Sequence, residues 1–294
     1  MNRVDLHIHS TASDGTVSPG DLVAMASENS LSMISITDHD TLDGIPEGAS
    51  AAIELEMEFI PGIELSVDLE DDGLSAHLLG YFPGADIPLL LSGSHSLGKA
   101  ISYVQGGRSR RNPRILKKLA DNGIYIEMEA VLIIAGGDVV GRPHIAEAML
   151  NAGYVGSLSE AFNRFLAKGK PAYVDRDRLS LFSAIDIIVE SGGLPVMAHP
   201  GYIEMNPKEL RRLFGKMKEH GLAGIEVYYP SHTASTISML LSIALEFQLV
   251  LTGGTDYHGR SNEAPALGGA DDGFHIKRED VKDFINLCRS RSRR

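Results

Sequence analysis

Short apolar segments recur along this chain, and most of them end beside a histidine or an acidic residue. Longer stretches of helical pattern separate them, which is typical of strand–helix units wound around a parallel sheet. Candidate strands cover residues 4–8, 33–37, 58–64, 74–81, 194–198, 224–228 and 248–252. Because parallel α/β enzymes build their sites at the carboxyl ends of the strands, we expect these polar residues to converge at one edge of the sheet.

Two histidines mark the end of the first predicted strand. His7 and His9 are two residues apart, and side chains at positions i and i+2 of a strand point to the same side of the sheet. Both imidazoles can therefore reach one metal ion. An exposed polar pair would look the same, so this motif needs support from the other strands.

That support comes from the other predicted strands, which carry similar residues at or near their ends. Each one alone is explained by a core histidine or a loop cap. Their joint placement along one edge favours a metal site. The residues concerned are Asp38, His39, Asp40, Glu64, His77, His199, Asp256 and His258.

Composition limits the possible functions. Of the 294 residues, 43% are hydrophobic and 22% charged, which is globular composition, and the single Cys288 excludes a disulfide framework or a Cys-rich zinc module. The net charge of −12 argues against broad contact with a nucleic-acid backbone. It leaves room for a small anionic substrate, because bound cations reverse the local field.

The sequence shows no apolar signal segment and no run approaching the ~18 apolar residues of a membrane span. We therefore expect a soluble, cytoplasmic protein that binds no membrane and forms no stable complex with DNA.

The strand pattern stops in the middle of the chain. We expect residues 1–85 and 171–294 to form the α/β body, and residues 86–170 to form an inserted helical unit that caps the substrate. Within this unit, helices are expected at residues 108–122 and 142–152, each followed by glycine.

A basic run lies in the first of these helices, at Arg108, Arg110, Arg111 and Arg114. We favour a solvated helix face for it. The alternative is that it steers a second phosphate or an RNA end towards the site.

The motifs together resemble the polymerase-and-histidinol-phosphatase (PHP) superfamily of metal-dependent phosphoesterases. The resemblance is carried by His7–Gly15, Thr37–Thr41, Pro61–Glu64, Ala198–Pro200 and Gly254–Gly259, in that order. The Gly141-Arg142-Pro143-His144 motif resembles the stand-alone subfamily that contains 3′,5′-nucleoside bisphosphate phosphatases and 5′→3′ exoribonucleases.

The resemblance implies a distorted (β/α)7 TIM-like barrel and two or three divalent ions. It implies three groups of ligands: His7, His9, Glu64 and Asp256 for the first ion; Glu64, His77 and His199 for the second; Asp14, His39 and His258 for the third. Longer relatives often have histidine where Asp14 stands, and a turn residue in Ser-Asp-Gly is the alternative for it.

The chemistry of these residues agrees with the resemblance. Imidazole and carboxylate ligands without thiolate suit Mn, Fe or Zn, and such ions support hydrolysis by an activated water that attacks phosphorus in line. Arg142 is expected to clamp phosphoryl oxygens, and His144 to bind phosphate or protonate the leaving oxygen. The alternative for Arg142 is a surface ion pair at a helix start.

Other polar residues are expected to support this site or to be structural. Asp38 and Asp40 flank His39 and are expected to orient it for catalysis as hydrogen-bond acceptors. His232 is either a substrate contact or a loop histidine. The histidines that match no ligand motif are interpreted as structural: His95, His220 and His275.

We therefore predict a metal-dependent phosphatase that converts a nucleoside 3′,5′-bisphosphate such as 3′-phosphoadenosine 5′-phosphate to the 5′-monophosphate, with 5′→3′ trimming of short RNA as a related activity. A histidinol-phosphate or sugar-phosphate phosphatase is the first alternative. A metal-stabilised module without catalysis is the second, and the complete ligand set argues against it.

Overall fold

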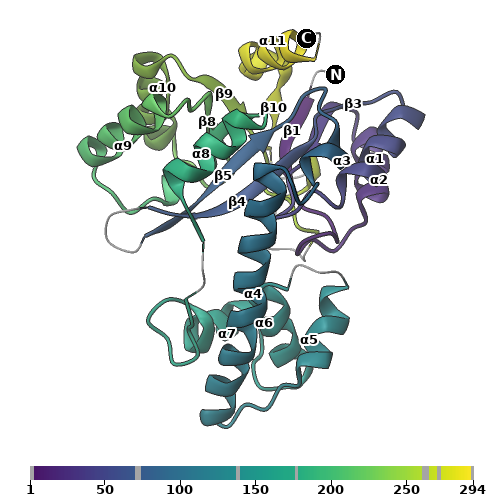
Figure 1. The fold of residues 1–294 in the computed structure, drawn as a ribbon, viewed down its shortest axis with the longest axis vertical. Coiled ribbons are helices and arrows are strands. Elements are labelled where there is room, and N and C mark those ends of the chain that lie inside the picture. Colours follow the sequence, from purple (N-terminus) through teal and green to yellow (C-terminus); the bar gives the residue numbers. More distant parts are fainter. Residues whose placement is uncertain are drawn as a thin grey trace.

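The computed structural model describes residues 3–69, 74–136, 140–175, 178–259, 265–269 and 273–292. These residues form an α/β body and a helical lobe that projects from it (Figure 1). In the part of the chain that is described, no helix is both long and apolar enough to cross a membrane.

The strands of the body form two sheets. The first has the order β10-β1-β2-β3, and the second has the order β6-β4-β5-β7-β8-β9. The bounds in the first sheet are β1 Arg3–Ile8, β2 Leu31–Ile36, β3 Glu58–Phe59 and β10 Ile276–Lys277. The bounds in the second sheet are β4 Gly62–Asp68, β5 Ser75–Tyr81, β6 Leu179–Ser180, β7 Leu194–Met197, β8 Gly224–Tyr228 and β9 Val250–Gly253.

Two isolated parallel bridges join the sheets, one between Ile8 and Tyr257 and one between His39 and Glu64. The first links β1 to the segment after β9, and the second links the segment after β2 to β4. Strands β1, β2, β4, β5, β7, β8 and β9 therefore follow one another around a distorted ring, as expected for a TIM-like α/β fold.

Among the described residues, two strands depart from the expected parallel arrangement, and one of them, β10, runs antiparallel to β1. The other, β5, runs antiparallel to both β4 and β7. The connection between Asp68 and Ser75 is too short for a crossover helix, and a short connection returns the chain in the opposite direction.

Helices surround this ring. Helix α1 begins with a side-chain cap, since the Ser18 side chain accepts a hydrogen bond from the Asp21 backbone N–H and Pro19 takes the first helical position. The α-helices of the body are α1 Pro19–Glu28, α2 Ile45–Glu54, α8 Leu181–Glu190, α9 Pro207–Glu219, α10 Ala234–Phe247 and α11 Lys282–Arg291. Short 3₁₀ segments are η2 Pro200–Tyr202, η3 Leu267–Gly269 and η4 Arg278–Val281.

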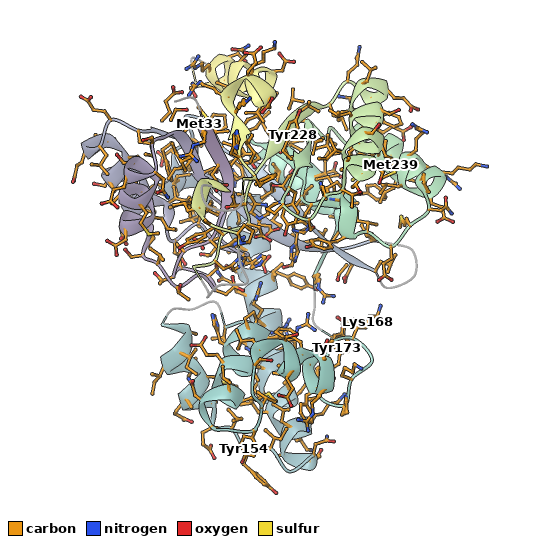
Figure 2. All side chains as sticks on the ribbon, turned by 180° about the vertical axis from the view of Figure 1, so that it is seen from behind. Met33, Tyr154, Lys168, Tyr173, Tyr228 and Met239 are labelled. Carbon is orange, nitrogen blue, oxygen red and sulfur yellow. The ribbon has the colours of Figure 1, made fainter. Side chains whose placement is uncertain are left out.

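The lobe has an apolar core of its own, which includes Ile115, Val131, Ile145 and Met149. Figure 2 shows Tyr173 at the end of the lobe that faces the barrel. The elements of this region are α3 Ile87–Leu90, α4 Ser96–Asp121, α5 Met128–Ala135, α6 Arg142–Asn151, α7 Leu158–Ala161 and the π-helical η1 Phe162–Leu166. The boundaries at residues 86 and 170 stay a prediction.

Helix α4 is longer than the sequence pattern indicates. It begins at Ser96 rather than near Arg108 and continues through Pro113. Leu97, Ile101 and Val104 are buried along its first turns, so packing against the body extends the helix beyond the basic run.

A buried ion pair fastens α4 to the barrel. The Arg108 guanidinium donates to the Asp40 carboxylate through Nε at 3.1 Å and also through Nη2. Gln105 Nε2 donates to the Asp40 carbonyl at 3.1 Å, and the same Asp40 carboxylate accepts from the Ser66 backbone N–H at 2.8 Å. Asp40 therefore joins β4 to the lobe.

We expect Arg108→Ala to lower the free energy of unfolding by about 3 kcal/mol, because it leaves the Asp40 carboxylate buried without its cation. Urea unfolding measures the change. The matched control is Arg114→Ala on the exposed side of the same helix, expected within about 0.5 kcal/mol of the parent chain. Equal effects of the two variants would contradict this account of the junction.

Candidate metal centre

The predicted ligands gather at one edge of the barrel, which the antiparallel strand β5 reaches near its amino end. His7 lies in β1, Glu64 in β4 and His77 in β5, whereas the remaining ligands lie in the loops that follow β1, β2, β7 and β9. The residues in these loops are His9, Asp14, His39, His199, Asp256 and His258.

Glu64 lies at the centre of the cluster and is fully buried. Its Oε1 is 3.3 Å from His7 Nε2. The same oxygen is 3.0 Å from His77 Nδ1 and 3.0 Å from His199 Nε2. Its Oε2 is 3.2 Å from His9 Nε2 and 2.9 Å from His39 Nδ1. One carboxylate therefore contacts five imidazoles.

Three groups in the cluster have the spacing that a metal ion requires, with ligand atoms within 4.8 Å of one another. One is the group expected for the first ion. The second group contains Glu64 and His77, as expected for the second ion, but has His39 as its third member. The expected third member, His199, lies 3.0 Å from the Glu64 carboxylate. The full groups are His7, His9, Glu64 and Asp256; His39, Glu64 and His77; and His9, Asp14, His39 and His258.

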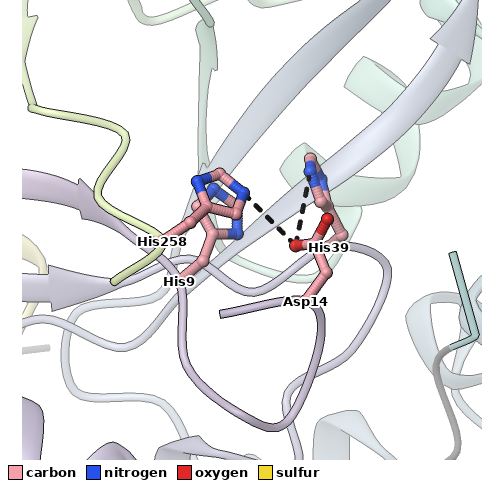
Figure 3. Close-up of side chains that lie close together, drawn as sticks. All are labelled: His9, Asp14, His39 and His258. Carbon is pink, nitrogen blue, oxygen red and sulfur yellow. Dashed lines mark ion pairs between the residues drawn. The ribbon is translucent and has the colours of Figure 1, made fainter. Parts of the chain in front are cut away.

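The third group lies on the loop side of the cluster (Figure 3). Asp14 Oδ1 is 3.2 Å from His258 Nε2 and 3.9 Å from His39 Nε2. The His9 ring stacks on the His258 ring with centroids 4.1 Å apart. His9 and His39 therefore each belong to two groups, whereas the family resemblance assigned each of them to one group.

The donor atoms fit a divalent cation. Among the described residues, His7 Nε2, His9 Nε2, Glu64 Oε2 and Asp256 Oδ1 are buried yet make no hydrogen bond of normal geometry. Buried polar atoms without partners are costly, and a shared cation would satisfy all of them. Their mixture of imidazole nitrogen and carboxylate oxygen suits Mn, Fe or Zn.

Glu226 orients this donor set from behind. Its Oε1 lies 3.0 Å from His7 Nδ1, which directs His7 Nε2 towards the cluster, and its Oε2 accepts from the His199 backbone N–H at 2.7 Å. The sequence analysis does not predict a role for Glu226. The feature that could have indicated one is its acidic side chain within the otherwise apolar predicted strand at residues 224–228.

Two further residues that the sequence analysis missed position the loop after β9, which carries Asp256. The Tyr229 hydroxyl donates to Asp256 Oδ2 at 3.0 Å, which leaves Oδ1 at 2.9 Å from His9. Burial and the nearby carboxylate raise the pKa of Tyr229, so its hydroxyl stays a donor. The buried Asp5 accepts from the Thr255 backbone N–H at 2.9 Å and from the Thr255 hydroxyl at 2.6 Å, and so anchors the same loop.

The backbone at the cluster is constrained as well. His199 and Asp256 have positive φ values of 25° and 56°, a region that residues other than glycine seldom occupy. Gly254 lets the loop after β9 pass His7, because a Cβ at this position would lie 2.2 Å from the His7 Cβ.

Asp38 and Asp40 do not orient His39 by accepting hydrogen bonds from its ring, as the sequence analysis expected. Asp38 accepts from the Ser10 backbone N–H at 2.7 Å, from the Ser10 hydroxyl at 2.6 Å and from the Ser13 hydroxyl at 2.5 Å. It therefore positions the loop that carries Asp14. Asp40 is occupied by Ser66 and Arg108.

His232 does not contact the cluster through a free nitrogen. Its Nδ1 lies 2.9 Å from the Val227 carbonyl, and its Nε2 accepts from the Gly201 backbone N–H at 3.2 Å. Burial lowers the pKa of His232, which agrees with a neutral ring that uses one nitrogen as donor and the other as acceptor. His232 therefore braces the loop after β7 instead of reaching substrate.

His144 also differs from its expected role. It is buried, and its Nδ1 accepts from the Gly141 backbone N–H at 3.2 Å at the start of α6. It is not among the residues that line the cavity beside the cluster. The role of an acid for the leaving group is therefore not retained for His144.

Half of the basic run faces inward, contrary to the favoured solvated face. Arg108 and Arg111 are buried, whereas Arg110 and Arg114 are exposed. The inward pair lines a cavity of about 180 Å³ that reaches the metal cluster. The residues lining this cavity are Asp14, His39, Ser66, Ser75, Ala76, His77, Arg108, Arg111, Arg142, Pro143, Phe162 and Arg178.

Arg178 is a further residue that the sequence analysis missed, and its local sequence carries no signal for this position. Its Nη1 donates to Asp68 at 2.7 Å and to Asp175 at 2.9 Å.

Arg142 lies over the rings of Phe162 and Tyr173 and donates to the Leu166 carbonyl at 3.0 Å. Burial lowers the pKa of its guanidinium.

The carboxylates set the protonation state of the cluster. Burial disfavours the charged form of His9, but its contacts with Asp256 and Glu64 outweigh burial and raise its pKa to about 10. Burial opposes the ionisation of Glu64, yet the surrounding His77, His7 and His39 hold its pKa well below the ordinary range.

We expect metal binding to release protons. At pH 7 a His9 pKa of about 10 means that the metal-free ring is protonated, whereas a ligand must be neutral. The affinity for Mn²⁺ should therefore rise with pH below that value. Calorimetric titration at pH 7 in buffers of different ionisation enthalpy measures the proton release. Heats that do not vary with the buffer would contradict this protonation state.

We expect Glu226→Gln to weaken metal binding by roughly 10- to 100-fold, because the neutral amide no longer polarises and holds the His7 ring. Competition with a chelating dye measures the affinity. Glu219→Gln, at an exposed position on α9, is the matched control and should leave the affinity unchanged. Parent-like affinity in Glu226→Gln would rule out the orienting role.

Comparison with known proteins agrees with this geometry. The PHP domain family matches residues 5–227. A 5′-3′ exoribonuclease of Haemophilus influenzae is 34% identical over 87% of this chain and 90% of its own length. A 3′,5′-nucleoside bisphosphate phosphatase of Chromobacterium violaceum is 30% identical over 98% of this chain and 95% of its own length.

A solved structure shows the same fold. A Bifidobacterium adolescentis protein described as a metal-dependent phosphoesterase has a TM-score of 0.83 and 28% identity, and the match covers 97% of this chain and 96% of that one. The match to the family covers most of the chain and includes the strands that carry His7, Glu64 and His77. This chain belongs to the PHP domain family.

Proposed function

We propose that this protein is a metal-dependent phosphoesterase that removes the 3′-phosphate from a nucleoside 3′,5′-bisphosphate and also trims short RNA from its 5′ end. One observation carries the proposal. The cavity of about 180 Å³ is lined by predicted metal ligands, which we call the metal wall, and by four arginines, which we call the arginine wall. A substrate with two phosphates can place one at each wall.

The metal wall consists of Asp14, His39 and His77. These residues, with the rest of the cluster around Glu64, would hold two or three divalent ions of Mn, Fe or Zn. When bound, such ions neutralise phosphoryl oxygens and activate water for attack on phosphorus.

The arginine wall binds the second phosphate. Arg108 and Arg178 are held by Asp40 and by Asp68, so they supply oriented donors rather than uncompensated charge. The Arg142 guanidinium instead donates to a carbonyl group and lies against aromatic rings. Its charge is therefore available for a phosphate, which an arginine fork can bind through paired donors.

A second cavity, of about 340 Å³, supports a nucleoside as the rest of the substrate. It adjoins the first, since both are lined by Ser75, Arg142, Phe162 and Arg178. It adds the rings of Tyr173 and Tyr202. Aromatic rings beside cations are the usual platform for an unpaired base. The names of the Haemophilus and Chromobacterium relatives support the same substrate class.

The chain's own residues contribute positioning in this mechanism. Glu226 holds the His7 ring, Tyr229 holds Asp256, and Asp38 holds the loop of Asp14. Arg142 fixes the distal phosphate, so that the scissile phosphate lies against the metal ligands. We assign no side chain as acid for the leaving oxygen, because His144 accepts through Nδ1 at the start of α6 and does not line the cavity.

Phosphate release from 3′-phosphoadenosine 5′-phosphate by the Mn²⁺-loaded protein tests the function. We expect inorganic phosphate and AMP to accumulate together. No release would overturn the substrate assignment, and hydrolysis of histidinol phosphate instead would establish the alternative phosphatase. Stabilisation by Mn²⁺ against thermal melting, without hydrolysis of any phosphoester, would favour a non-catalytic module.

We expect Arg142→Ala to lower kcat/KM for the bisphosphate by roughly 10- to 100-fold, as loss of a charged hydrogen-bonded contact does. p-Nitrophenyl phosphate has no second phosphate, so kcat/KM for this substrate should fall much less. The Arg142→Lys variant keeps the charge but lacks the forked donors. Its kcat/KM for the bisphosphate should therefore lie between the values of the parent chain and of Arg142→Ala. Equal losses on both substrates would contradict the clamp.

A further inference from the structure

A larger cavity lies at the other end of the barrel. It has a volume of about 500 Å³ and is lined by Arg3, His275, Lys277, Arg278, Glu279, Lys282, Ile285, Asn286 and Arg289. Arg3 begins β1, whose carboxyl end carries the metal ligands, so the barrel separates this cavity from the metal centre. Helix α11, which forms one side, lies at the end of the body opposite the lobe (Figure 1).

The lining is strongly basic in an acidic protein. Its cations come from β1, from the segment beginning with β10, and from α11, whereas Glu279 is the only acidic residue that lines it in the described part of the chain. The whole chain carries a net charge of −12. A basic concavity against that background is an attractive site for an anion.

Two of the cations oppose each other directly. Arg3 in β1 and Lys277 in β10 are register partners in the antiparallel ladder, and both line the cavity. Like charges in directly opposite positions of a sheet destabilise it. Within the described residues, Arg3 Nη2 donates to the Asn29 carbonyl, whereas Arg3 Nε is buried without a hydrogen-bond partner. An anion between these two side chains would relieve the repulsion and accept from Arg3.

The remaining cations are partly neutralised by protein carboxylates. Arg278 donates to Glu58 at 2.6 Å, and Arg289 lies 3.1 Å from the same carboxylate. Lys282 pairs with Glu279 at 2.6 Å. These pairs border the cavity, while Arg3 and Lys277 are the groups that an external anion would bind.

We propose that this cavity is a second anion site, which binds a small molecule carrying two linked phosphate groups. Its volume is in the range of small-molecule sites, and Arg3 and Lys277 provide two adjacent cations for two adjacent phosphates. The proposal does not depend on the function of the metal centre. Free pyrophosphate and the diphosphate end of a nucleotide share this chemistry, and the test separates them.

The experiment titrates the Mn²⁺-loaded full chain with pyrophosphate and, separately, with ADP by calorimetry. In the parent chain we expect a binding event besides any at the metal centre. Lys277→Ala should weaken that event at least tenfold, since it removes a charged contact. Lys117→Ala, an exposed lysine on α4, is the control. Binding of pyrophosphate alone assigns the site to the free anion, and binding of both assigns it to the diphosphate group.

Phosphate release by the metal centre serves as the internal reference and should be unchanged in Lys277→Ala. Identical titrations in the parent chain and Lys277→Ala would overturn the proposal, as would the absence of an event outside the metal centre.

A second variant distinguishes loss of anion binding from loss of folding. Lys277→Glu places a carboxylate opposite Arg3 and replaces repulsion with attraction. We expect a higher melting temperature without ligand at low salt, together with loss of the pyrophosphate event. A lower melting temperature with parent-like binding would overturn the proposal.

Discussion

The cluster depends on one buried carboxylate. Glu64 lies within 3.3 Å of a nitrogen from each of five histidines, which reach it from four strands or the loops after them. A buried negative charge is costly unless cations or hydrogen-bond donors surround it. The bridge between His39 and Glu64 joins the two sheets at the same place, so Glu64 takes part both in the contact between the sheets and in the candidate site.

A layer of acidic and phenolic groups lies behind the histidines and keeps their free nitrogens directed inward. Glu226, Tyr229 and Asp5 act on β1 and on the loop after β9, and Asp38 acts on the loop that carries Asp14. The lobe contributes differently: it brings Arg108, Arg111 and Arg142 to the cavity beside the cluster. In the proposed function, the barrel would supply the metal ligands and the lobe would supply charge that recognises substrate.

Sequence reasoning found the α/β class, and the nine residues predicted as metal ligands lie close together in the structure. Strand-end position and residue type are local features that indicated most of them, whereas Asp14 was indicated by the family resemblance. Sequence reasoning missed Glu226, Tyr229 and Arg178 because their roles depend on partners far along the chain. Main-chain groups contact both ring nitrogens of His232, which agrees with the loop-histidine alternative, and Nδ1 of His144, and no local sequence feature indicates these contacts. Burial of Arg108 and Arg111 follows from how α4 docks on Asp40, which no periodicity in the basic run indicates.

Metal content is the most direct test of this account, because Glu64 belongs to two of the three ligand groups whereas Asp14 belongs to one. Elemental analysis of the purified, Mn²⁺-equilibrated protein measures the ions retained by the parent, by Glu64→Gln and by Asp14→Asn, with circular dichroism to verify folding. The account predicts that Glu64→Gln loses more ions than Asp14→Asn. A folded Glu64→Gln protein with the metal content of the parent would contradict the central place of this carboxylate.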